Sequence, residues 1–198
     1  MPSTAIKPER QENNTPVFIR KVPWNGFTYN EYMSWDDEIF CELMDGIPYL
    51  MAPPSILHQE IVGEIHVQLK KYLKNKPCKV FVSPIGVRLF PEKNGKDKNI
   101  VLPDVVVVCD EKKLSDGKTI NGPPDFAIEV VSPSSKGHDM INKRDLYKAA
   151  GVKEYWAVDE DKIYKYVLQK KVYRETVFTL KKGLAVEPDV LKGCVIRF

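Results

Sequence analysis

The segments IVLPDVVVV (residues 100–108) and PDFAIEVV (residues 124–131) are two nearly continuous runs of apolar residues. Runs of this kind, rich in β-branched side chains, are typical of strands that are covered on both faces of a sheet. A polar loop at residues 115–122 separates them. We therefore expect both segments to lie in the middle of one sheet.

Two segments on either side of these runs have helical periodicity. Ser55 can cap the first helix, whose apolar positions recur with a period near 3.6 and are Ile61, Val62, Ile65, Leu69, Tyr72 and Leu73. The second helix extends from about residue 139 to residue 150 and ends at Gly151, a residue type that favours helix C-termini. A short helical turn is expected within residues 27–38.

Strand patterns complete the domain. Asp45-Gly46 separates two apolar runs and indicates a hairpin. Residues 79–90 favour one strand, and EYWAVD at 154–159 favours another. Residues 162–198 alternate apolar and charged positions, which indicates an antiparallel hairpin at a sheet edge. The order predicts an α/β fold with a mixed β-sheet flanked by helices and an antiparallel C-terminal hairpin.

Length and composition restrict the class of protein. The 198 residues fit one domain, which we place at residues 28–198 after a poorly ordered extension at residues 1–27. The net charge of +3 does not by itself indicate a nucleic-acid-binding protein, so any basic surface must be local. The four cysteines form no CxxC pair, which predicts reduced thiols and no zinc site. No long apolar run is present, and we expect a soluble intracellular protein without membrane contact.

Two acids interrupt the central strands. Asp104 lies in the first apolar run and Glu129 lies in the second. An ionised carboxylate buried without a partner costs several kcal/mol, so the pair predicts a shared cation. Pro103 cannot donate to a strand ladder, and a distortion at this proline would redirect Asp104.

Lys143 is a third charge at a position where an apolar residue is expected. It shares one helical face with Asp139, Leu146, Tyr147 and Ala150, so its ammonium can point at the two acids. A buried ion pair is the alternative explanation for each of these charges taken singly. Together, two strand carboxylates and one inward lysine form a minimal set for metal-assisted phosphodiester hydrolysis.

At these residues the sequence resembles the PD-(D/E)XK nuclease superfamily. Its motifs correspond to Pro103-Asp104 and to Glu129-Val130-Val131. More closely, the chain resembles the putative restriction endonuclease family, a domain of unknown function abundant in cyanobacteria. This resemblance covers about residues 30–175, in the blocks FCELMDG, LPDVVVV, GPPDFAIEVVSPSS, the 139–143 helix and AGVKEYWAVD.

The resemblance implies a restriction-endonuclease-like fold and a Mg²⁺-dependent nuclease, with Mn²⁺ as a possible substitute. Asp104, Glu129 and the backbone carbonyl of Val130 would be its metal ligands. One departure is that Val131 stands where the superfamily has a lysine. Lys143, on the following helix, is the candidate that replaces it. The resemblance also points to Glu42 as a fourth catalytic candidate, although an exposed strand acid is an equally good explanation.

Several other polar residues remain open. His58 is in phase with Val62 and Ile65, which favours a structural role over catalysis. Asp139 can orient Lys143 or cap its helix, and the SPSS segment at 132–135 can form a turn or offer hydroxyls to phosphate. Candidate contacts to a nucleic-acid backbone are Lys70, Lys71, Lys74, Lys93, Lys96 and Lys98.

The sequence thus favours a Mg²⁺-dependent endonuclease acting on DNA. A nuclease fold that serves only as a binding or scaffold protein is one alternative, because a fold does not fix a function. A phosphodiesterase acting on RNA or on small nucleotides is the other. We also expect a homodimer, because cutting both DNA strands requires two sites and the C-terminal hairpin leaves a free edge.

Overall fold

The computed structural model describes residues 22–35, 39–131 and 137–198, and in the last range the side chains of residues 138 and 139 lie outside the description. The chain forms two compact units. Unit 1 comprises the described residues up to Pro53 together with Arg88–Val101, and unit 2 comprises Pro54–Val87 and Leu102–Phe198. The boundaries expected from sequence, 1–27 and 28–198, stay predictions.

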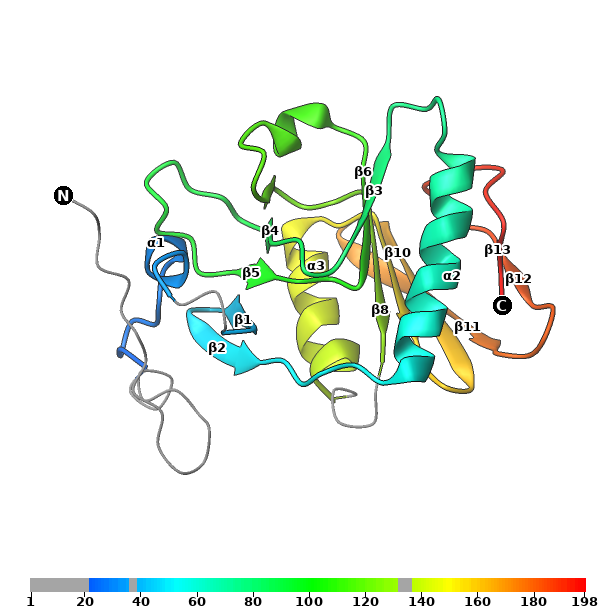
Figure 1. The fold of residues 1–198 in the computed structure, drawn as a ribbon, viewed down its shortest axis with the longest axis horizontal. Helices are drawn as coiled ribbons and strands as arrows, with labels where there is room; N and C mark the ends of the chain where they lie inside the picture. Colours follow the sequence, from blue (N-terminus) through cyan, green and yellow to red (C-terminus); the bar gives the residue numbers. More distant parts are fainter. Residues whose placement is uncertain (1–21, 36–38, 132–136) are drawn as a thin grey trace. The chain divides into compact units, whose positions relative to one another are not determined.

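Unit 2 contains a six-stranded mixed sheet in the order β11-β10-β9-β8-β6-β3 (Figure 1). Strands β8 and β9 are parallel, and the other neighbours are antiparallel. The strands are β3 (Lys79–Val82), β6 (Val105–Val108), β8 (Phe126–Val130), β9 (Glu154–Val158), β10 (Lys162–Gln169) and β11 (Val172–Thr179). The predicted α/β class and the C-terminal hairpin β10-β11 are therefore confirmed. Strands β6 and β8 lie inside this sheet as expected, but residues 100–101 of the first apolar run belong to a different sheet, so the expectation that both runs lie in one sheet is only partly right.

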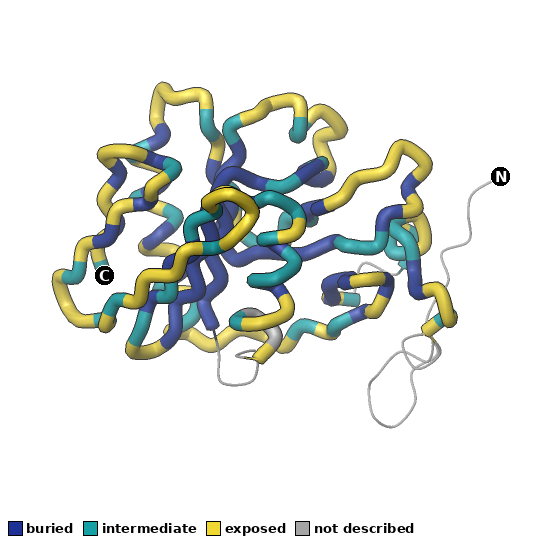
Figure 2. The backbone as a smooth tube through the Cα atoms, turned by 180° about the vertical axis from the view of Figure 1, so that it is seen from behind, coloured by how far each residue is buried: buried dark blue, intermediate teal, exposed yellow. Residues whose placement is uncertain are grey.

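Helices cover both faces of this sheet. The helix α2 (Ile56–Tyr72) packs on the face that carries Phe126, Ile128 and Val130. On the opposite face lies α3 (Arg144–Ala150), preceded by the π-helical segment η3 (His138–Lys143). Successive strand residues alternate between faces, so Glu129 of β8 points toward the α3 side. Every residue of β6, β8 and β9 is buried, as the dark central strands of Figure 2 show.

Local sequence signals explain where the helices begin and end. The Ser55 hydroxyl accepts a hydrogen bond from the His58 backbone N–H at 3.1 Å, which caps α2 as predicted. Gly151 ends α3 in the left-handed conformation, at φ 87°. Within the part of the chain that the structure describes, no helix is both long and apolar enough to span a membrane.

The two extended segments that contain prolines do not form continuous strands. Residues 100–108 divide into β5 (Ile100–Val101) in unit 1 and β6 in unit 2, and the break includes Pro103 and Asp104. The predicted distortion at Pro103 is thus confirmed. The prediction of one strand over 79–90 is wrong, because Pro84 separates β3 from β4 (Val87–Arg88). A proline lacks the N–H that a strand ladder needs.

Unit 1 is built around the predicted hairpin, β1 (Cys41–Met44) with β2 (Ile47–Leu50). Its other elements are the short helix α1 (Tyr29–Tyr32) and β5, which pairs with β1. At the turn Gly46 has φ +79°, and a Cβ there would lie 2.7 Å from the Cα of Gly26. Only glycine fits this close approach of two backbones. The core of the unit contains Phe27, Leu43 and Ile100.

The remaining elements are short and belong to unit 2. They are the 3₁₀-helix η2 (Glu111–Leu114) and the strands β7 (Ile120–Asn121), β12 (Ala185–Val186) and β13 (Ile196–Arg197). Strands β12 and β13 pair with each other. Val186 and Ile196 from this pair join the core between α2 and the sheet. The C-terminal segment therefore completes the same face that α2 covers.

The expectation of four reduced thiols is wrong, because Cys78 and Cys109 form a disulfide. Cys78 precedes β3 and Cys109 follows β6. In the antiparallel register Lys79 pairs with Val108, so the next residues outward, the two cysteines, face each other. They are 31 residues apart in sequence. Only the strand register brings them together, and cysteine spacing alone does not contain that information.

Thiol counting tests this disulfide. In protein purified without reductant, we expect two reactive thiols after unfolding and four after unfolding with reduction. In the native state neither free cysteine should react readily. Both are buried, and burial raises the pKa of Cys41 to about 12 and that of Cys194 to about 11. Four thiols in unfolded, unreduced protein would contradict the disulfide.

Candidate active site

The two predicted acids lie at the same end of adjacent strands in unit 2. Val105 of β6 pairs with Ile128 of β8, and the same register continued by one residue sets Asp104 opposite Glu129. The Val130 backbone N–H donates to Asp104 Oδ2 at 2.8 Å. Asp104 is 8% exposed and Glu129 is 3% exposed. Each is a buried carboxylate, and a buried charge needs positive charge or hydrogen-bond donors around it.

The helical segment on the α3 side supplies donors to Glu129. Lys143 Nζ lies 2.9 Å from Glu129 Oε1, and the Tyr147 hydroxyl donates to the same oxygen at 2.7 Å. The two residues are four apart in sequence, which sets both on one helical face. Lys143 is 3% exposed, so this is a buried ion pair. Removal of either charge would leave the other one buried without its partner.

His58 contacts Asp104 from the other side of the sheet. Its Nε2 lies 3.1 Å from Asp104 Oδ2, the oxygen that also accepts the Val130 N–H. The Ser55 cap fixes the first turn of α2, which holds His58 in place. No residue in the described part of the chain donates to Asp104 Oδ1. This oxygen is therefore available to a further ligand.

Four of the predicted residues thus come together in unit 2: Asp104, Glu129, Val130 and Lys143. Glu42 belongs to β1 of unit 1, so its part in the site stays a prediction. Its interpretation as an exposed strand acid is wrong, because Glu42 is buried. The side chain of Asp139 and the segment 132–135 lie outside the described residues.

Sequence reasoning missed two contacts. The helical pattern indicates only that Tyr147 belongs to the apolar face, yet its hydroxyl reaches Glu129. Its spacing of four residues from Lys143 was the available signal. For His58 the sequence favours a structural role, and the structure sets its ring against Asp104. The available signal for His58 was that this polar residue is in phase with the apolar face of its helix and lies close to the helix N-terminus.

The donor set of this site consists of oxygen atoms. Asp104 and Glu129 offer carboxylates, and the Val130 carbonyl leaves its strand on the same side as the N–H that binds Asp104. Among the described residues no group of three or more His, Cys, Asp or Glu side chains could hold a metal ion. Mg²⁺ is commonly bound through one or two carboxylates and keeps several waters. The residues present therefore fit this ion.

The fold and the arrangement of these residues define a restriction-endonuclease-like protein. Residues 29–197 match the model of the Uma2 family, described as "Putative restriction endonuclease", and the chain belongs to this family. The crystal structure of a "putative nuclease belonging to DUF820" from Anabaena variabilis has the same fold, with a TM-score of 0.65 and 18% identity. The match covers 83% of this chain and 91% of that chain. No protein with a curated description matches the sequence significantly.

Proposed function

We propose that this protein is a metal-dependent endonuclease that hydrolyses phosphodiester bonds in DNA. The observation that carries the proposal is the pair of buried carboxylates, Asp104 and Glu129, at the ends of β6 and β8, with Lys143 against Glu129. Membership in a family described as restriction endonucleases supports the same reaction class.

Asp104, Glu129 and the Val130 carbonyl would hold Mg²⁺, or Mn²⁺ as a substitute. When bound, the ion would neutralise charge on the scissile phosphate and make water a better nucleophile near neutral pH. The hydrogen bonds from the Val130 N–H and His58 fix the orientation of Asp104. Tyr147 does the same for Glu129. A ligand set held in advance needs little rearrangement when the substrate binds.

Lys143 would act on the substrate itself. Its ammonium already lies beside Glu129 in a region closed to solvent. Charge interactions are stronger in such an environment than in water. As negative charge grows on the phosphoryl oxygens in the transition state, Lys143 Nζ would donate to them. This is the part that the superfamily's strand lysine would play, and Val131 cannot supply it.

The experiment that tests the function uses purified protein with supercoiled DNA, linear DNA and RNA. Each substrate is incubated with Mg²⁺, with Mn²⁺ or with EDTA. We expect DNA to be cleaved with either metal and to remain intact with EDTA. Cleavage of RNA alone would favour the phosphodiesterase alternative. The absence of cleavage on every substrate, with metal bound, would favour the scaffold protein instead.

We also expect a homodimer. In the six-stranded sheet β11 is an outer strand, and an outer strand can pair with that of a second copy. Two copies would bring two sites to the two strands of a duplex. Multi-angle light scattering across the micromolar range checks this expectation, and a monomer mass at high micromolar concentration would contradict it.

A further inference from the structure

A basic groove lies at the other end of α2 from His58. It has a volume of about 590 Å³ and runs between the C-terminal half of α2 and the start of β3. Val67, Leu73 and Val80 are among the apolar residues that line it. Its cationic and titratable lining residues are His66, Lys70, Lys71, Lys74, Lys76 and Lys79. The lining contains no acidic residue.

Most of this charge is available to a ligand. Lys79 pairs with Glu111 at 2.9 Å, and Lys76 lies over the Tyr72 ring at 3.2 Å from its centroid. Lys70, Lys71 and Lys74 are exposed and make no ion pair with any residue that the structure describes. Five lysines around one groove repel each other, and an anion would relieve that repulsion.

The helix dipole explains only part of this concentration of charge. Lysines in the last turn of a helix interact favourably with its partial negative charge, which accounts for Lys70 and Lys71. Lys76 and Lys79 lie beyond the helix, in the connection to β3 and on β3 itself. Their contribution to the same groove needs another explanation.

We infer that this groove binds the phosphodiester backbone of the DNA substrate away from the scissile bond. The inference rests on the proposed function, because it assigns the groove to the same substrate. Lysines are point charges that suit phosphate contacts independent of base sequence. Five lysines around one groove offer more positive charge than a single small anion needs, and a polymer of phosphates can meet several of them.

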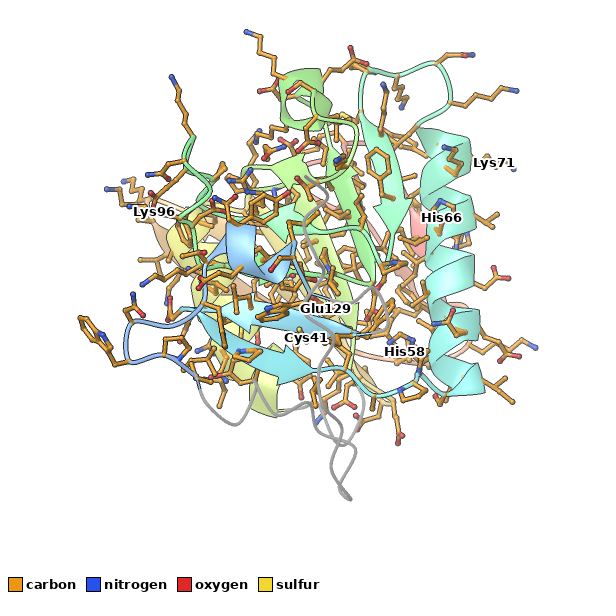
Figure 3. All side chains as sticks on the ribbon, turned by 60° about the vertical axis from the view of Figure 1, so that its left-hand side comes forward. Cys41, His58, His66, Lys71, Lys96 and Glu129 are labelled. Atoms are coloured by element: carbon orange, nitrogen blue, oxygen red, sulfur yellow. A yellow bond between two sulfur atoms is a disulfide. The ribbon has the colours of Figure 1, made fainter. Side chains whose placement is uncertain are left out.

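Helix α2 connects this groove to the proposed active site, because the first turn of the helix carries His58 and its C-terminal half lines the groove. His58 and Lys70 are twelve residues apart on one helix, about 18 Å at 1.5 Å per residue. B-form DNA rises 3.4 Å per base pair, so this length corresponds to about five base pairs. Gly63, between them, shares the side of the helix that carries Lys70, and a Cβ on it would meet nothing within 4 Å. Figure 3 shows His58, His66 and Lys71 at successive levels along the helix.

The test measures binding without cleavage. Fluorescence anisotropy with a labelled 20-base-pair duplex in EDTA gives the Kd at several salt concentrations. Lys70→Ala/Lys74→Ala is compared with Lys181→Ala/Lys182→Ala, which removes the same charge from exposed positions of unit 2 outside the groove. We expect the groove variant to raise the Kd at least about tenfold at 0.1 M salt and to lower the slope of log K against log salt by about 2. The control variant should stay near wild type.

The outcomes separate this inference from the proposed function. If only the groove variant loses affinity for DNA, the result supports the assignment of the groove to DNA binding, whether or not the wild type cleaves DNA. Equal affinity of both variants and the wild type overturns the groove assignment, even if DNA is cleaved. Equal loss in both variants overturns it too, because a diffuse charge effect would then be the cause. Circular dichroism checks that both variants are folded, and alanine favours helix at position 70.

Discussion

Lys143→Met is expected to lower the single-turnover rate of DNA cleavage about 10² to 10³-fold, the loss typical for removal of one preorganised donor to a developing oxyanion. Methionine keeps most of the volume of the lysine and removes the charge together with its N–H donors. Asp104 and Glu129 remain in place, so metal binding should survive. A rate within about threefold of wild type would show that Lys143 is structural and that it does not replace the superfamily's lysine.

The structure adds a stability effect to this prediction. Lys143 and Glu129 form a buried ion pair, and loss of one partner typically lowers the free energy of unfolding by about 3 to 5 kcal/mol. The Tyr147 hydroxyl still donates to Glu129 in the variant, which favours the lower part of that range. A double variant, Lys143→Met/Glu129→Gln, replaces the pair by neutral groups. Urea unfolding should show that the double variant recovers stability that the single variant loses.

The second large effect concerns metal binding. Wild-type protein is expected to bind Mg²⁺ or Mn²⁺ in titration calorimetry, and Asp104→Asn and Glu129→Gln are each expected to abolish this binding and the cleavage. Both substitutions preserve shape and remove the negative charge that a hard cation requires. Metal at 100 times its Kd should also stabilise the wild type by about 2.7 kcal/mol, visible as a higher melting temperature.

Glu154→Gln is the matched control for these variants. Glu154 is a fully buried carboxylate on β9 of the same unit, with hydrogen bonds from Trp156 Nε1 and the Val190 N–H. Burial raises the pKa of Glu154 above its usual value. Its substitution removes a buried acid from a place that the proposed site does not use. Metal binding by Glu129→Gln equal to that of Glu154→Gln would contradict the metal assignment.

The apolar pattern predicted which strands lie at the centre of the sheet, because the need for burial determines both the apolar pattern of a strand and its central position. The runs at 100–108 and 124–131 had to be covered, and β6 and β8 are buried throughout. Helical phase likewise pointed Lys143 toward the sheet, because position on a helix follows from spacing alone. The break at Pro103 could be predicted from the sequence because proline lacks the N–H that a strand ladder needs.

What escaped prediction depends on pairing between distant segments. The Cys78–Cys109 disulfide and the contact of His58 with Asp104 each join residues that only strand register or helix packing brings together. The division of residues 100–108 between two units is similar, because both parts are apolar and the pattern cannot tell which core each one joins. Sequence periodicity describes one element at a time, and these features belong to pairs of elements.

We propose that a metal held by Asp104 and Glu129 supports the hydrolysis of DNA by this protein. Wild type and Glu129→Gln, purified in parallel, are mixed with supercoiled plasmid, and the reaction is started with Mg²⁺. We expect wild type to convert supercoiled DNA to nicked and linear forms, and Glu129→Gln to do so at least about 100-fold more slowly. Equal rates for the two proteins, or an intact plasmid with wild type under conditions where calorimetry detects bound metal, would contradict it.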